Sequence, residues 1–150
     1  SQRWHETFLA AGSELKPGLF MLDSGCFRSI GGAPTHARMT EHLRQYGLKP
    51  LSVNKVEEFV FGNCNTELSD KNFLYPMFFN GQLCDYVDIA RITPDYPGLL
   101  SKNKMKGWDV LMDFGNQETH VQKYSHKSPF INNSQFLNIF DMGAPDARDL

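Results

Sequence analysis

One acidic tripeptide in this sequence has the form of a catalytic turn. Asp23-Ser24-Gly25 directly follows the apolar run from Leu19 to Leu22, which predicts a buried strand that ends at a carboxylate. The glycine lets the backbone turn closely and lets another chain approach, and the serine hydroxyl can hydrogen-bond across a subunit interface. Two such turns that face each other bring two carboxylates close enough to share a proton. One carboxylate then acts as a base and the other as an acid toward a water molecule.

The second carboxylate must come from another copy of the chain. The remaining aspartates considered for this role lack a following Ser/Thr-Gly, and we interpret them as surface, turn or strand-end residues: Asp70, Asp85, Asp88, Asp95, Asp109 and Asp113. A two-fold axis between paired Asp23 residues gives the self-complementary interface of a homodimer. The predicted chemistry requires neither a metal ion nor a cofactor. Taken alone, however, Asp-Ser-Gly is more often an ordinary turn or a helix cap.

Cysteine and histidine offer weaker candidates for chemistry. Cys26, Cys64 and Cys84 are widely spaced and form no Cys-x-x-Cys pair, which indicates free thiols in a reducing compartment. Cys26 next to the tripeptide is either a small buried spacer or, as a less favoured alternative, a catalytic nucleophile. The histidines do not cluster into a ligand set by spacing, so no metal site is predicted; they are His5, His36, His42, His120 and His126.

The elements that must position the tripeptide are mostly strands. We expect one clear helix, capped by Thr35 and running to about Tyr46 after a loop at 31–34, and a brief helix at 104–108. Further strands are expected at 51–61, 73–79, 86–92, 110–114, 120–124 and 136–140. Asn80-Gly81 predicts a tight hairpin. The pattern favours a mostly β fold, such as a closed Greek-key barrel.

Two segments resemble a known family. The segment 20–32 resembles the active-site segment of retropepsin-like aspartic proteases, especially those of copia-type retrotransposons, where an apolar strand enters Asp-Thr/Ser-Gly-Ala. Cys26 stands here at the position of the alanine. The segment 96–105 resembles the late segment of the family, in which an apolar pair leads into Gly-Arg-Asp/Asn and a short helix. Ser101 and Lys102 depart from that pattern, and lysine lacks the planar bidentate fork of arginine.

The resemblance, which runs from about residue 19 to 140, implies a fold, a function and roles for particular residues. It implies a closed, barrel-like retropepsin fold and a two-fold symmetric homodimer that cleaves peptide bonds, with the parent polyprotein as substrate. The implied catalytic residues are Asp23, Ser24 and Gly25. The implied substrate-binding residues are Cys26 and Leu99, with Phe61, Gly62 and Asn63 in a flap that closes over the substrate. Lys102 and Asn103 are expected to brace the dimer.

Composition excludes several other classes of function. The 15 basic and 17 acidic residues nearly balance and form no basic stripe, so we expect neither nucleic acid nor a membrane as a partner. We find no signal peptide or spanning segment, which makes an intracellular location the default expectation. We expect an arm or short helix over 1–15, the protease domain over 16–142 and a flexible end over 143–150. The start at Ser1 suggests a fragment of a longer protein.

Two alternatives stay open at the level of sequence. A decayed relative of the family would keep the barrel and the dimer as a peptide-binding or scaffold module, and two features favour it: Lys102 and the unusual surroundings of the flap. An unrelated β-barrel interaction domain would use Asp23 only as a turn residue. The intact Asp23-Ser24-Gly25 tripeptide argues against the decayed relative, and a structure in which Asp23 lies far from any symmetry mate would favour the unrelated domain.

Overall fold

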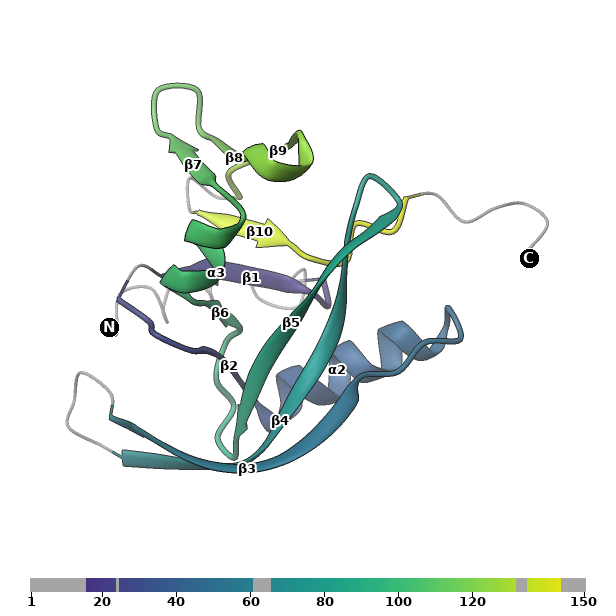
Figure 1. Cartoon of the computed structure of the whole chain (residues 1–150), viewed down its shortest axis with the longest axis vertical. Helices are drawn as coiled ribbons and strands as arrows, with labels where there is room; N and C mark the ends of the chain where they lie inside the picture. Colours follow the sequence, from purple (N-terminus) through teal and green to yellow (C-terminus); the bar gives the residue numbers. More distant parts are fainter. Residues whose placement is uncertain (1–15, 24, 61–65, 132–134, 144–150) are drawn as a thin grey trace.

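The computed structural model describes residues 16–23, 25–60, 66–131 and 135–143, and these residues form a mostly β structure, as predicted (Figure 1). The helical elements are α2 (Ala33–Arg44), α3 (Lys102–Gly107) and the short 3-10 helix η2 (Gln122–Tyr124). The strands are β1 (Leu19–Leu22), β2 (Ser29–Gly32), β3 (Leu51–Val60), β4 (Thr66–Phe79), β5 (Gln82–Ile92), β6 (Leu99–Leu100), β7 (Val110–Asp113), β8 (Glu118–Val121), β9 (His126–Pro129) and β10 (Phe136–Asn138). Neither α2 nor α3 is long and apolar enough to cross a membrane.

Strand β6 lies between β1 and β2 in the larger sheet. Seven strands pair in the order β10-β1-β6-β2-β5-β4-β3, and β7-β8-β9 form a separate antiparallel sheet. β6 runs parallel to β1, with Leu99 opposite Met21, and antiparallel to β2, with Leu99 opposite Ile30. The two-residue strand therefore joins the segment before Asp23 to the segment that follows it.

The larger sheet is open in the part of the chain that the structure describes. Its strand order has two ends, β10 and β3, and one isolated bridge between Phe78 and Phe140 connects β4 to the segment after β10. The predicted closure into a barrel is therefore not seen among these residues. The expected mostly β class is confirmed.

The first helix begins earlier than the sequence predicted. α2 starts at Ala33, with Pro34 in its first turn and Gly32 as its N-cap residue, which provides no side-chain cap. Proline suits the first turn because its fixed φ matches the helix and its missing N–H needs no partner there. The hydroxyl of Thr35 donates to the Tyr96 carbonyl at 2.8 Å and does not cap the helix. The predicted loop at 31–34 is thus the end of β2 followed directly by α2.

The other boundaries follow from turns and caps. Asn80 and Gly81 have φ values of 54° and 77°, which confirms the predicted hairpin turn. α3 begins before the predicted 104 because the Ser101 side chain accepts from the Lys104 amide and caps the helix. The predicted strand at 120–124 is instead the end of β8 followed by η2. β9 was missed because its sequence, His-Lys-Ser-Pro, has no apolar alternation.

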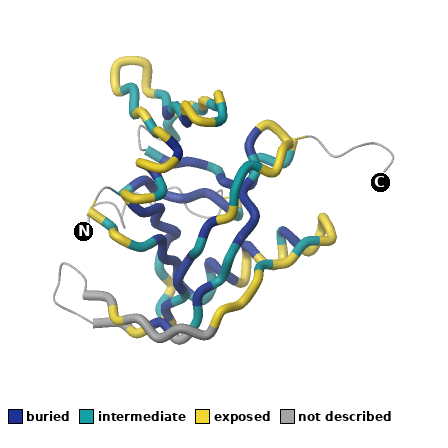
Figure 2. The backbone as a smooth tube through the Cα atoms, viewed as in Figure 1, coloured by how far each residue is buried: buried dark blue, intermediate teal, exposed yellow. Residues whose placement is uncertain are grey.

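Strand β1 is buried on both faces (Figure 2). Phe20 and Leu22 pack into a large core with residues of β4, β5 and α3, whereas Leu19 and Met21 pack into a smaller core with residues of β2, β6 and β10. A strand that is buried on both faces has a continuous apolar sequence. This burial accounts for the uninterrupted Leu-Phe-Met-Leu run before Asp23.

Candidate active site

The backbone of buried strands fixes the position of Asp23. Its amide N–H donates to the Leu100 carbonyl at 3.3 Å, and its carbonyl accepts from the Cys26 amide at 3.1 Å. The carboxylate oxygen Oδ1 accepts from the Gly25 amide at 2.9 Å. The side chain is half-buried. A carboxylate oriented by a backbone N–H in this way keeps one oxygen available for a further partner.

The late segment is bonded directly to the loop that carries Asp23. The Lys102 amide donates to the Cys26 carbonyl at 2.9 Å, and the Ser101 amide donates to the buried Ser29 hydroxyl at 3.0 Å. These bonds connect the N-terminus of α3 to both ends of the active-site loop. The two segments that resemble the family therefore lie side by side.

Cys26 is a half-buried thiol that is bonded through its backbone amide to Asp23. Burial raises the pKa of Cys26 to about 11, and the negative charge of Asp23 adds to this rise. The Sγ atom lies 2.6 Å from the Arg28 carbonyl oxygen, to which it donates. Because the thiolate is the nucleophilic form of cysteine, this environment favours the interpretation of Cys26 as a spacer.

Tyr96 lies beside Asp23 and was not among the predicted site residues. It packs with Cys26 against the smaller core. Its backbone carbonyl accepts from the Gly32 amide at 2.9 Å and from the Thr35 hydroxyl. Burial raises the pKa of Tyr96 to about 12, and the charges of Cys26 and Asp23 add to the effect. Only its place three residues before Leu99 could have suggested this position from the sequence.

The loop after Cys26 combines an exposed aromatic ring with an ion pair. Phe27 is 79% exposed. Arg28 Nη2 lies 3.1 Å from Asp88 Oδ2, which links the loop to β5. Neither Phe27 nor Arg28 was predicted as a site residue.

The other predicted site residues fall into two groups. Leu99 is 3% exposed and packs in the smaller core, while Lys102 and Asn103 are exposed in the first turn of α3. Ser24, Phe61, Gly62 and Asn63 lie outside the described residues. The roles predicted for all of these residues in substrate binding, catalysis or dimer contacts stay predictions.

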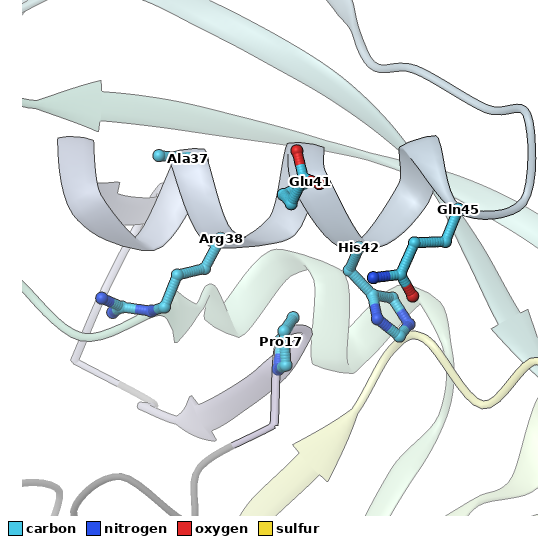
Figure 3. A pocket seen from close by; sticks show the side chains of 6 residues that line it. All are labelled: Pro17, Ala37, Arg38, Glu41, His42 and Gln45. Atoms are coloured by element: carbon cyan, nitrogen blue, oxygen red, sulfur yellow. The ribbon is translucent and has the colours of Figure 1, made fainter.

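A separate open hollow of about 390 Å³ lies along α2, away from the predicted site residues (Figure 3). Figure 3 shows Arg38 and His42 extending from α2 on the side that faces Pro17. The hollow is lined by Pro17, Ala37, Arg38, Glu41, His42 and Gln45. None of the residues predicted for catalysis, substrate binding or dimer contacts lines it.

Strand pairing also assembles a cluster that spacing along the chain did not reveal. Asp113, Glu118 and His120 have ligand atoms within 4.8 Å of one another. No histidine was predicted to belong to a ligand set, because spacing along the chain does not show the register of the β7–β8 hairpin.

Comparison of the chain with models of known protein families found no match. Comparison with curated proteins likewise found no match.

Proposed function

We propose that this chain is one half of a homodimeric aspartic endopeptidase with a retropepsin-like fold. The observation that carries the proposal is the position of Asp23. Its carboxylate projects from the end of a strand that is buried on both faces, and the Gly25 amide orients it. A general acid or base must be held in a fixed position to work efficiently.

The arrangement of the strands supports the proposal. The apolar pair Leu99-Leu100 lies between β1 and β2 and leads directly into the short helix α3. The two segments that resemble the family thus contact each other through backbone hydrogen bonds, as two parts of one active site must. The proposed fold includes a closed sheet, whereas the described residues form an open one.

In the proposed mechanism, two Asp23 carboxyl groups act on one water molecule. The ionised Asp23 takes a proton from the water as its oxygen attacks the scissile carbonyl carbon. The partner's Asp23, which is protonated, donates a hydrogen bond to the developing oxyanion. The tetrahedral intermediate then collapses, the carbon–nitrogen bond breaks, and the leaving nitrogen receives a proton from the carboxyl pair.

The role of the neighbouring residues follows from this geometry. Cys26 is a small side chain that packs against the smaller core, and its high pKa keeps a second negative charge away from Asp23. Lys102 and Asn103 are exposed on α3, close in sequence to the Lys102–Cys26 backbone bond, where a second copy can contact them. The proposed substrate is an extended peptide.

The substitution Asp23→Asn tests the proposal. It removes the ionisable group and keeps the size of the side chain, so peptide cleavage should fall by about a thousandfold or more. Cleavage of a denatured protein substrate at mildly acidic pH, with and without pepstatin, measures this effect. Asp109→Asn is the matched control, because Asp109 is exposed after α3 and has no part in the mechanism. Cleavage by Asp23→Asn at the rate of the unaltered chain would rule out the mechanism.

A dimeric peptide-binding module without turnover is the second candidate. The lysine at 102, where the family pattern has arginine, favours it because a weaker brace would leave the two carboxylates less well fixed. Binding of pepstatin by the unaltered dimer without any cleavage would indicate this module. A chain that sediments as a monomer at all concentrations would contradict both candidates.

A further inference from the structure

The β7–β8 hairpin places three potential metal ligands on one face. Asp113 of β7 lies directly opposite Glu118 of β8, and Leu111 lies opposite His120. Alternate residues of a strand share a face. Asp113, Glu118 and His120 therefore project from the same side of the small sheet.

The three side chains are close enough to share one ion. His120 Nε2 lies 4.0 Å from Asp113 Oδ2 and 4.0 Å from Glu118 Oε1. The ligand atoms of a tetrahedral zinc ion lie about 3.4 Å apart, given bonds of about 2.1 Å. Small rotations of side chains that are each about one-third exposed would close this difference.

Two unfavourable features meet at this point. Like charges directly opposite each other across a strand pair destabilise a sheet, and Asp113 and Glu118 form such a pair. In addition, His120 Nε2 is inaccessible to solvent and has no hydrogen-bond partner in the described structure. A buried polar atom without a partner carries a desolvation penalty. A cation between the three side chains would remove both penalties.

Lys127 makes no ion pair with Asp113 or Glu118 in the part of the chain that the structure describes. On β9, Pro129 is opposite Glu118, and the exposed Lys127 is opposite His120. Asp113 is held in place by Asn116, whose backbone amide and side-chain amide donate to it at 3.0 and 2.8 Å.

We propose that Asp113, Glu118 and His120 bind a divalent transition-metal cation of the zinc class. One imidazole nitrogen and two carboxylates suit such an ion better than calcium or magnesium, which prefer oxygen ligands alone. Three protein ligands leave a coordination position for water. The ion would cross-link β7 to β8 and stabilise the small sheet. The site does not depend on the proposed peptidase function, because it shares no residue with the Asp23 loop.

Calorimetric titration of the metal-free chain with zinc chloride tests the site. We expect one zinc ion per chain and a rise in melting temperature on saturation. Glu118→Gln removes the carboxylate charge and His120→Gln removes the imidazole nitrogen, so each should weaken zinc binding by more than about tenfold. Glu41→Gln is the matched control, since Glu41 is an exposed glutamate on α2, and its affinity should equal that of the unaltered chain.

A second measurement separates this site from the thiols. Cobalt(II) bound to carboxylates and imidazole gives weak visible bands, whereas thiolate ligands add an intense near-ultraviolet band. We expect the weak bands alone, lost in His120→Gln. The proposal is overturned by an intense thiolate band, or by zinc affinity in folded Glu118→Gln and His120→Gln equal to that of the unaltered chain. Circular dichroism establishes that the variants are folded.

Discussion

The Asp23 loop and the β7–β8 hairpin both position carboxylates, but by different means. Asp23 is held by backbone hydrogen bonds to Leu100, Cys26 and Gly25 at the end of a buried strand. In the hairpin, Asp113 accepts from the backbone and side-chain amides of Asn116, Glu118 lies opposite Asp113, and the tip of the sheet is exposed (Figure 2). The first region offers one carboxylate per chain, and the second offers a complete group of three ligands.

The difference shows what each region requires from outside. The Asp23 loop is positioned by the core of its own chain, yet its proposed chemistry is incomplete without a second copy. The hairpin has all of its proposed metal ligands within one chain, yet its opposed charges and its buried imidazole nitrogen would be compensated only when the proposed cation binds. A carboxylate can therefore be firmly held without a complete set of chemical partners, as at Asp23, and a complete set can lie on an exposed hairpin, as at His120.

The substitution Gly32→Ala should give the largest effect, because it attacks the backbone packing behind the Asp23 loop. A Cβ atom on Gly32 would overlap the carbonyl oxygen of Pro94 and the amide nitrogen of Tyr96. Backbone atoms of this kind cannot move aside as a flexible side chain can. We expect a loss of about 3 kcal/mol or more in the free energy of unfolding, or failure to fold. Urea denaturation measures the loss.

Gly107→Ala provides the control for that result. A Cβ at Gly107 would meet nothing within 4 Å, and alanine is the better helix former. The free energy of unfolding should stay within about 1 kcal/mol of the unaltered chain. Equal losses in Gly32→Ala and Gly107→Ala would show that the Asp23 region is not held by close backbone packing, and the comparison of the two regions would fail.

Lowering the pH should give the next largest effect, through a buried histidine behind the active-site strands. His36 lies 3.0 Å from the Ala90 carbonyl through Nε2 and 2.6 Å from the Tyr75 hydroxyl through Nδ1. Because a carbonyl only accepts, Nε2 carries the proton and Nδ1 accepts from Tyr75. Burial lowers the pKa of His36 to about 4; the hydrogen bond to Ala90 opposes this shift, and the Arg91 charge adds to it.

The sign of the pH effect follows from that shift. The unfolded chain takes up the proton near pH 6.5 and the folded chain only near pH 4, so protonation favours the unfolded state between these values. The neutral His36 therefore contributes to the free energy of unfolding in full above pH 6.5, and this contribution is lost as the pH falls to 4. The total loss is on the order of 3 kcal/mol. Urea denaturation across this range measures it. His36→Gln should show a flatter dependence, and equal slopes in the two proteins would contradict the assignment.

Features that depend on residues adjacent in the sequence could be predicted. The apolar run before Asp23 predicts β1 because the strand is buried on both faces, and Asn80-Gly81 predicts a hairpin because few other pairs tolerate two positive φ values. The position of β6 was suggested only by the resemblance, since two leucines carry no periodicity. The strand order of the sheet has no local signal.

Features that depend on register or on distant packing were missed for the same reason. Tyr96 reaches the Asp23 loop because Gly32 and Thr35 hold its carbonyl, and these contacts span more than 60 residues. The cluster at His120 requires the exact pairing of two four-residue strands. A shift of one residue would move its ligands to opposite faces. No pattern in the sequence specifies that register.

Asp85→Asn should give the smallest of these effects, and it examines the connection between the two regions. Asp85 Oδ2 accepts from Trp108 Nε1 at 2.8 Å and from Lys104 Nζ at 3.2 Å, which ties β5 to α3. Burial favours the neutral acid, but the bonds from Trp108, Tyr86 and Lys104 outweigh it and lower the pKa of Asp85. Loss of the charge should lower the free energy of unfolding by about 1 to 2 kcal/mol.

The exposed ion pair of Glu41 and Arg44 on α2 is the control with which the loss of stability in Asp85→Asn is compared. Their atoms Oε1 and Nη2 lie 2.8 Å apart, but both side chains are mostly exposed, so Glu41→Gln should change stability by less than about 0.5 kcal/mol. Hydrogen exchange of the α3 amides distinguishes local from global loosening in Asp85→Asn. α3 connects β6 to β7. Faster exchange in α3 with unchanged exchange in β1 would mean that the hairpin can loosen while the Asp23 loop stays fixed. Faster exchange in both means that Asp85 makes the two regions one cooperative unit.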